Sequence, residues 1–280
     1  AWEMEHDSRV ICLGDSITAQ GRPGYSQYLH DRLATHPPTA QAWEAFNMGV
    51  HGYSVLQGLR LFQTRGRPLA PDIVTVYFGW NDHWRIDTPD RQQMALRMGP
   101  RMGHLIEALR GKRLFQLLSR VIRPVRKAGE GDAGLVLRVP PEEYRAALRD
   151  LAAAIRAAGA IPIFITAPRR GLTEWQVQNR YVKTVEEGNR LHDQYVEITR
   201  QVARDDKVEL VDLAAIFAGP ECDRYFAADG IHFDERSSSP IYMPMEQFEE
   251  KKRPGNSGCE DPRITVIGNT LYMLYTAYDG

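Results

Sequence analysis

Four short blocks of the chain carry the residue types that acyl transfer requires. Gly14–Ser16 (GDS) supplies a hydroxyl group, and Asp229–His232 (DGIH) is the only Asp-x-x-His in the chain. At this spacing within one loop, a carboxylate can orient an imidazole, which can then activate a serine as a nucleophile. The blocks between them, Asn47–Gly52 (NMGVHG) and Gly79–Asp82 (GWND), contain glycines and an asparagine that could bind the negative charge formed on the acyl oxygen.

Each block alone has a plain structural explanation. A serine that follows a strand is commonly a helix cap, and glycine or asparagine commonly forms a turn. Glycine also lets a backbone N–H approach a reacting oxygen, and Asn81 offers a side-chain NH₂ donor. In this order, and each after a predicted strand, the four blocks indicate one site. Ser16 lacks the G-x-S-x-G elbow, so the usual α/β-hydrolase arrangement is not expected.

Short apolar runs predict the strands that position these blocks, and helical spacing predicts the segments between them. A continuous apolar run that ends in a turn is typical of a strand buried on both faces. The predicted strands are Arg9–Leu13, Trp43–Met48, Asp72–Phe78, Ile161–Thr166 and Val208–Leu213. The predicted helices are Tyr25–Ala34, Leu56–Phe62, Tyr144–Ala158 and Glu187–Arg204. This alternation predicts a parallel sheet covered on both faces, with the site at the carboxyl ends of the strands.

Composition argues against several other classes of protein. The formal net charge of the 280 residues is −1, which gives no overall argument for a nucleic-acid or membrane partner. Cys12, Cys222 and Cys259 are far apart and form no CxxC pair, so neither a disulfide framework nor a zinc site is predicted. We expect no metal, no cofactor and no membrane span. The N-terminus shows no signal pattern and lacks an initiator Met, so the compartment stays open, as does the oligomeric state.

The segment Arg97–Lys127 is strongly basic. It contains nine Lys or Arg residues against one acid, Glu107, and an apolar stripe. We expect a cap packed over the site with a solvated basic face. The alternative is an amphipathic helix that binds an anionic surface.

The blocks GDSIT, NMGVHG, GWND and DGIH resemble those of the SGNH (GDSL-type) hydrolases. The resemblance covers about residues 9–234. It implies an α/β, flavodoxin-like three-layer sandwich with a parallel five-stranded sheet. It also implies a serine esterase or acyl hydrolase that uses no metal.

Carried over by motif, the resemblance assigns a role to five residues. Ser16 would be the nucleophile and His232 the general base, which Asp229 orients. The N–H groups of Ser16 and Gly52, with the amide of Asn81, would bind the oxyanion. The substrate would be a small-molecule ester, and our preference is an acetyl ester linked to a carbohydrate.

After His232 the sequence pattern changes. Glu246–Lys252 predicts at most a short polar helix, whereas Ile264–Ile267 and Leu271–Tyr278 predict strands joined by a Gly268-Asn269 turn. The stretches GCEDPRIT and LYMLYTAYDG resemble the β-propeller glycosidases that include the inverting mannoside phosphorylases, over about residues 229–280.

By that second resemblance, Asp261 would be the acid that protonates the sugar and Arg263 a contact to substrate or phosphate. About 50 residues cannot build a propeller, which needs four or more blades. We therefore predict a chimera, with an SGNH domain at 1–234 that lacks its usual last helix and a β-hairpin tail at 235–280. We expect the missing helix to expose apolar surface and to leave His232 loosely held.

Two alternatives to an active esterase remain. The broken C-terminus could leave an inert carbohydrate-binding or assembly module. More distantly, the chain could be a fragment related to the mannoside phosphorylases.

Overall fold

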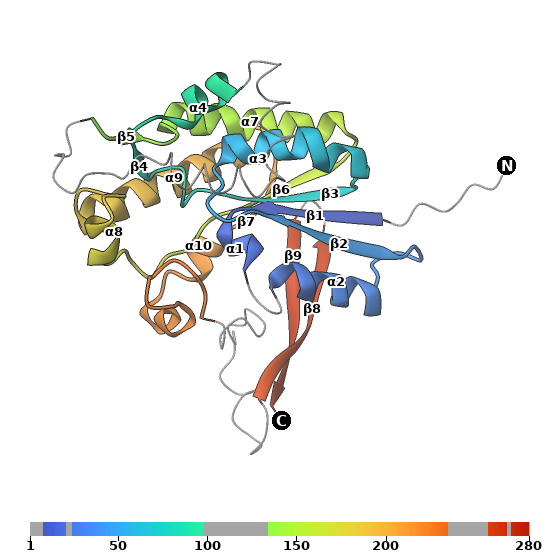
Figure 1. Ribbon diagram of the computed structural model, residues 1–280. Helices are drawn as coiled ribbons and strands as arrows, with labels where there is room; N and C mark the ends of the chain where they lie inside the picture. The colour runs from blue at the N-terminus through green and yellow to red at the C-terminus, as the bar shows by residue number, and fades with distance from the viewer. Residues whose placement is uncertain (1–7, 21–23, 98–133, 235–256, 268–269, 280) are drawn as a thin grey trace, which may run out of the picture.

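A five-stranded parallel sheet forms the centre of the fold (Figure 1). The computed structural model describes residues 8–20, 24–97, 134–234, 257–267 and 270–279. The strands of the sheet are β1 (Ser8–Gly14), β2 (Trp43–Gly49), β3 (Ile73–Tyr77), β6 (Ile161–Ile165) and β7 (Glu209–Val211). Their order is β2-β1-β3-β6-β7, which is the flavodoxin-like order. The five predicted strands and the predicted fold class are confirmed.

Helices cover both faces of the sheet, as a buried parallel sheet requires (Figure 1). One face carries α3 (Val55–Leu61), α4 (Asp90–Arg97), α7 (Pro141–Ala157) and α9 (Val185–Asp205). The other face carries α1 (Ser16–Ala19), α2 (Tyr25–Thr35) and α10 (Leu213–Ile216). The four predicted helices correspond to α2, α3, α7 and α9.

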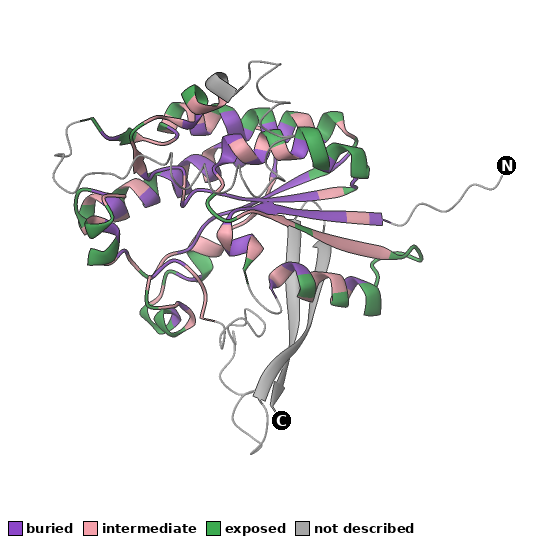
Figure 2. Ribbon diagram, viewed as in Figure 1, coloured by how far each residue is buried: buried purple, intermediate pink, exposed green. Residues whose placement is uncertain are grey.

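Alternating side chains of β1 supply both halves of the core. Ile11 and Leu13 pack into the large cluster that α3, α7 and α9 complete. Val10 and Cys12 point to the opposite face, where Leu33 of α2 covers them. Figure 2 shows β1 and β3 largely buried, whereas the edge strand β2 is only partly buried. The centre of the sheet is therefore its most buried part, and it is the part from which the Gly14–Ser16 block emerges.

Several short elements complete the described chain. They are a π-helix (Phe62–Gly66), a 3₁₀-helix (Arg67–Leu69), the antiparallel pair β4 (Arg85–Ile86) and β5 (Val136–Leu137), helix α8 (Glu174–Gln178) and the 3₁₀-helix η3 (Pro220–Tyr225). Strands β8 (Ser257–Ile267) and β9 (Thr270–Asp279) form a separate two-stranded antiparallel sheet, in agreement with the two predicted strands. The basic segment Arg97–Lys127, apart from its first residue, and the predicted helix Glu246–Lys252 lie outside the described residues. Within the part of the chain that the structure describes, no helix has the length and apolar character needed to cross a membrane.

Two histidines form a neutral pair in the core beside the GWND block. His192 Nε2 donates to the carbonyl of Ala167 at 2.8 Å, which leaves Nδ1 of His192 to accept from His83 Nε2 at 3.2 Å. The Trp80 ring stacks on His192 at 3.8 Å between centroids. Burial lowers the pKa of His83 well below its ordinary value and that of His192 to about 4, so both rings are neutral at pH 7.

This pair makes the stability of the fold depend on pH. In the unfolded chain a histidine takes up a proton near pH 6.5, whereas folded His192 does so only near pH 4. The contribution of His192 to the free energy of unfolding is therefore complete above pH 6.5 and is lost as the pH falls toward 4. We expect the stability difference between wild type and His192→Gln to shrink by about 2 kcal/mol between pH 7 and pH 5. Urea unfolding at both pH values measures it.

The difference in stability between wild type and His192→Gln isolates the effect of the buried pair, whereas the pH dependence of wild-type stability alone does not. Burial raises the pKa of Asp15 to about 6 and that of Asp82 to about 7, so these carboxyls titrate in the same window with the opposite sign. The exposed His36→Gln is the matched control. An equal change with pH in that control would contradict the assignment to the buried pair.

Candidate active site

Ser16 stands at the point where the central strand turns into a helix. β1 ends at Gly14, and Ser16 is the first residue of α1. The carboxylate of Asp15 caps this helix by accepting the N–H of Ile17 at 3.0 Å. Backbone N–H groups in a first helical turn have no partner within the helix, so the N–H of Ser16 lies where an anion would be stabilised.

Two glycines let α1 lie directly on the ends of the strands. Gly14 and Gly49 are neighbours in the β1–β2 register. A Cβ at Gly14 would lie 2.0 Å from Thr18 Oγ1, and one at Gly49 would lie 2.3 Å from the backbone nitrogen of Ala19. Asn47 adds a polar link, because its Nδ2 donates to the carbonyl of Thr18 at 2.9 Å. Any side chain at either glycine would push the helix, and Ser16 with it, off the sheet.

Ser16, His232 and Asp229 form one chain of hydrogen bonds. Ser16 Oγ lies 2.8 Å from His232 Nε2, and His232 Nδ1 lies 2.6 Å from Asp229 Oδ2. Burial alone would raise the pKa of Asp229, but hydrogen bonds from the His232 ring and from the backbone N–H groups of Ile231 and His232 bring it below its ordinary value. Asp229 is therefore a carboxylate, which holds the Nδ1–H tautomer of His232 and turns its Nε2 lone pair toward Ser16.

The loop that carries Asp229 and His232 is closed by its own backbone. Ala227 N–H donates to the carbonyl of His232 at 2.7 Å, and Asp234 N–H donates to that of Tyr225 at 2.9 Å. Phe226 and Phe233 form an antiparallel bridge. All of these partners precede residue 235. The expectation of a loosely held His232 stays a prediction, and in this geometry a short hairpin-like closure within residues 225–234 positions the histidine.

A second anchor comes from the loop that follows β6. Arg170 N–H donates to the carbonyl of Gly230 at 3.1 Å, and the fully buried Gln176 donates through Nε2 to the carbonyl of Asp229 at 3.0 Å. Gly230 has φ +72°, and a Cβ there would lie 1.9 Å from the carbonyl oxygen of Gly171. Both the conformation and the space therefore require glycine at this position.

The two predicted oxyanion donors outside Ser16 lie on neighbouring loops. Val50 N–H donates to the carbonyl of Gly14 at 3.0 Å, which brings the turn containing Gly52 to the end of β1. Gly52 has φ +74° with open space around its Cβ position, so its conformation rather than crowding requires glycine. Asn81 Nδ2 donates to Asp15 Oδ2 at 3.3 Å and keeps a second N–H for another acceptor.

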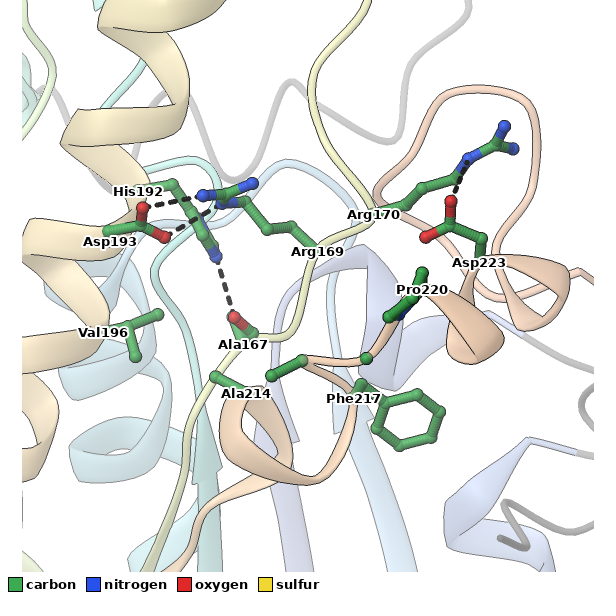
Figure 3. Close-up of a pocket in the computed structure, with 12 residues that line it drawn as sticks. Ala167, Arg169, Arg170, His192, Asp193, Val196, Ala214, Phe217, Pro220 and Asp223 are labelled. Carbon is green, nitrogen blue, oxygen red and sulfur yellow. Dashed lines mark hydrogen bonds and ion pairs between the residues drawn. The ribbon is translucent and has the colours of Figure 1, made fainter.

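A cavity of about 340 Å³ lies between the loop after β6, α9 and the α10–η3 segment (Figure 3). Arg169 makes a two-pronged ion pair with Asp193, at 2.7 and 2.9 Å, and Arg170 approaches Asp223 at 3.6 Å. The predicted triad residues do not line this cavity. Within the described ranges, no cluster of three His, Cys, Asp or Glu side chains is arranged to hold a metal ion.

The roles suggested for two tail residues are not tested by the structure, and two residues near the site had no predicted role. Asp261 and Arg263 lie in β8 next to a register irregularity, and their side chains are outside what the structure describes, so their suggested roles stay predictions. Sequence reasoning gave no role to Asn47 or Gln176. Asn47 begins the NMGVHG block, which was a usable signal, whereas nothing in the sequence marked Gln176.

Comparison with sequence families gives one match over most of the chain. The model of the GDSL-like lipase/acylhydrolase family matches residues 12–237. No curated protein sequence is significantly similar to the chain.

Solved structures of similar fold come from three bacterial or environmental sources. A lipase/acylhydrolase from Enterococcus faecalis is 17% identical, with a TM-score of 0.54, and the match covers 84% of this chain and 91% of that one. LAE5, an alpha/beta hydrolase from the metagenome of Lake Arreo, Spain, is 20% identical with a TM-score of 0.52, at coverages of 84% and 91%. A variant of Axe2, an acetyl-xylooligosaccharide esterase from Geobacillus stearothermophilus, is 18% identical with a TM-score of 0.51, at the same coverages. At these identities the likeness shows the fold.

The packing of Gly230 yields a test of the loop. We expect Gly230→Ala to slow the reaction of Ser16 with a fluorophosphonate by more than about 100-fold, because the methyl group must displace Gly171 and with it the Asp229–His232 pair. The rate of labelling measures this, and thermal unfolding reports whether the fold persists.

Gly159→Ala is the matched control. Gly159 also has a positive φ, of +84°, but it follows α7 and has open space around its Cβ position. We expect it to lower stability by about 1 kcal/mol and to leave labelling unchanged. Equal labelling rates in the two variants would show that the contact with Gly171 does not position the triad.

Proposed function

Because the chain belongs to the GDSL-like lipase/acylhydrolase family and is a carboxylic ester hydrolase, we propose that it cleaves small esters through an acyl-enzyme on Ser16. The observation that carries this proposal is the hydrogen-bond chain from Ser16 Oγ through the His232 ring to the Asp229 carboxylate, at 2.8 and 2.6 Å. The fold supports it by bringing residues 216 positions apart in the sequence, Ser16 and His232, into hydrogen-bond contact.

In the proposed mechanism His232 takes the hydroxyl proton as Ser16 Oγ attacks the ester carbon. The Asp229 carboxylate stabilises the imidazolium that forms. His232 then gives the proton to the departing alkoxide, which leaves as the alcohol, and the acyl group stays on Ser16. A water molecule, deprotonated by His232, attacks this second ester. The bond from the acyl carbon to Ser16 Oγ then breaks, His232 returns the proton to Oγ, and the carboxylic acid is released.

The proposed oxyanion hole consists of the N–H groups of Ser16 and Gly52 and the amide of Asn81. The first helical turn of α1 supports the role of Ser16, because its N–H groups lack intrahelical partners. The fixed placements of Gly52 and Asn81 on loops beside Ser16 support the other two. Loss of one such donor typically lowers turnover by about 10² to 10³.

An acetylated carbohydrate is the proposed substrate class. Axe2, whose fold is similar, is described as acting on acetyl-xylooligosaccharides. In this chain a row of aromatic rings runs outward from the GWND block: Trp84 lies 5.3 Å from Tyr181, which lies 5.7 Å from Trp175. Trp175 is 53% exposed, and its neighbour Gln176 contacts the catalytic loop. The exposed ring of Trp175 suits the apolar face of a sugar ring.

The tail at 235–280 has a separate proposal. The family match ends at residue 237, before β8 begins, and the likeness of the tail to propeller glycosidases is carried by its sequence alone. We propose that the chain is a chimera and that its two parts divide at about residue 234. Uninterrupted, independently recovered DNA reads across codons 225–245 would count against an assembly accident.

Hydrolysis of p-nitrophenyl acetate tests the proposed function. We expect turnover by the 280-residue chain and its loss by at least about 10³-fold in Ser16→Ala, because the nucleophile is removed. Release of p-nitrophenol measures the rate. Equal rates in the two proteins would contradict the proposal and favour an inert binding or assembly module.

Substitution of Trp175 tests the substrate class. We expect Trp175→Ala to raise KM for an acetylated xylooligosaccharide by about 10-fold, because a stacking contact is worth about 1–1.5 kcal/mol. KM for p-nitrophenyl acetate should not change, since it carries no sugar. Leu69→Ala, at an exposed residue (37%) of the 3₁₀-helix Arg67–Leu69, is the control. A parallel change of KM for both esters would count against a sugar site.

A further inference from the structure

Arg138 joins three separate segments behind the turn that contains Gly52. Its Nη1 donates to the carbonyl of Gly52 at 2.7 Å and its Nη2 to Gln57 Oε1 at 2.9 Å. Its Nε donates to Asp90 Oδ1 at 2.9 Å. The side chains of Arg138 and Asp90 are only 15% and 2% exposed, so this ion pair is shielded from solvent. A charged pair with this little exposure holds its geometry better than a surface pair.

The other carboxylate oxygen of Asp90 binds Ser54, the residue that follows the turn. Ser54 Oγ donates to Asp90 Oδ2 at 2.5 Å. Ser54 also caps α3 with Gln57 in a capping box. Asp90 is therefore fully engaged, with one oxygen toward Arg138 and one toward Ser54, and it holds the start of α3 and the guanidinium in one arrangement.

The turn itself transmits this constraint to the N–H of Gly52. Tyr53 N–H donates to the carbonyl of Val50 at 3.1 Å, and Gly52, at φ +74°, takes the third position, as in a type II turn. Val50 is fixed at the other end by its N–H bond to the carbonyl of Gly14. The Gly52 carbonyl is bound to Arg138, and the Tyr53 N–H is bound to the Val50 carbonyl. The two peptide planes on either side of the one that carries the Gly52 N–H are therefore held, which restricts the orientation of that N–H.

The backbone of Arg138 ties the same turn to the GWND block. Arg138 N–H donates to the carbonyl of Trp84 at 2.8 Å, and Val139 N–H donates to that of Asp82 at 2.9 Å. Asp82 Oδ1 in turn accepts the N–H of Val55 at 2.8 Å. The loop of Gly52 and the loop of Asn81 are therefore crosslinked through the segment that contains Arg138.

We propose that Arg138 is a positioning residue that sets the distance and orientation of the Gly52 N–H relative to Asn81 in the oxyanion hole. It touches neither the substrate nor the reacting atoms, and it acts through the Gly52 carbonyl. The inference rests on the proposed function, in which Gly52 and Asn81 bind the oxyanion. Because the oxyanion forms only in the transition state, the effect belongs in kcat rather than in KM.

Arg138→Lys is the test, because lysine keeps the charge but cannot make the three-way fork of a guanidinium. We expect kcat for p-nitrophenyl acetate to fall by about 10- to 100-fold with KM within about twofold. The affinity for phenylboronic acid, which forms a tetrahedral adduct with the serine, should fall in step. Rates are taken per active site, counted by end-point titration with a fluorophosphonate, so a partly unfolded sample lowers the count and not kcat.

Arg145→Lys is the matched control. Arg145 donates from Nη2 to Gln201 Oε1 at 2.9 Å and approaches Glu142 at 3.8 Å, but it joins α7 to α9 away from the turn. We expect its kcat and its affinity for the boronic acid to equal those of wild type. An equal loss of kcat in both arginine variants would overturn the proposal.

Asp90→Asn is a second test that leaves Arg138 in place and replaces its charged acceptor with a neutral one. We expect a smaller loss of kcat in the same direction, so a wild-type kcat per site in this variant would overturn the proposal even if Arg138→Lys does not fold. Unchanged kcat per site in Arg138→Lys, or a loss confined to the number of titrated sites, would overturn it too. Absence of Ser16-dependent hydrolysis in wild type would instead contradict the proposed function.

Discussion

The close contact between α1 and the ends of β1 and β2 is the constraint on which the site depends. A helix of four residues has no stability of its own, since a helical nucleus costs more than so few hydrogen bonds return. It persists because Gly14 and Gly49 leave room for it, Asn47 binds the carbonyl of Thr18 and Asp15 caps its first turn. The same carboxylate accepts from Asn81, so the nucleophile and a proposed oxyanion donor share one support.

Sequence predicted the sheet well because its strands are buried on both faces. Such strands read as unbroken apolar runs, and the predicted strand at 9–13 differs from β1 by only a residue at each end. The motif blocks were also placed correctly at the carboxyl ends of strands, since chain order and parallel pairing fix that edge. By contrast, the sequence assigned no role to Arg138 itself, because its partners are 48 and 86 residues away along the chain.

The contacts that hold the loop with Asp229 and His232 could not be predicted from the sequence. Sequence reasoning considered only a helix expected after the histidine and therefore predicted loose geometry, which stays a prediction. In the structure the loop is held by the Phe226–Phe233 bridge, on both sides of His232, and by the loop after β6. Backbone hydrogen bonds of this kind do not depend on side-chain type, so a sequence pattern carries little sign of them.

The contact between Gly230 and Gly171 also bears on how such enzymes can diversify. The backbone of one loop fills the space that any side chain on the other would need. Residues 166–176 and 226–233 therefore behave as a single unit of exchange. A recombination event, or a designer grafting loops to change specificity, would have to transfer both together. Helix α9 would have to match the first of these loops as well, because its Asn189 accepts the N–H of Leu172 and its Asp193 pairs with Arg169.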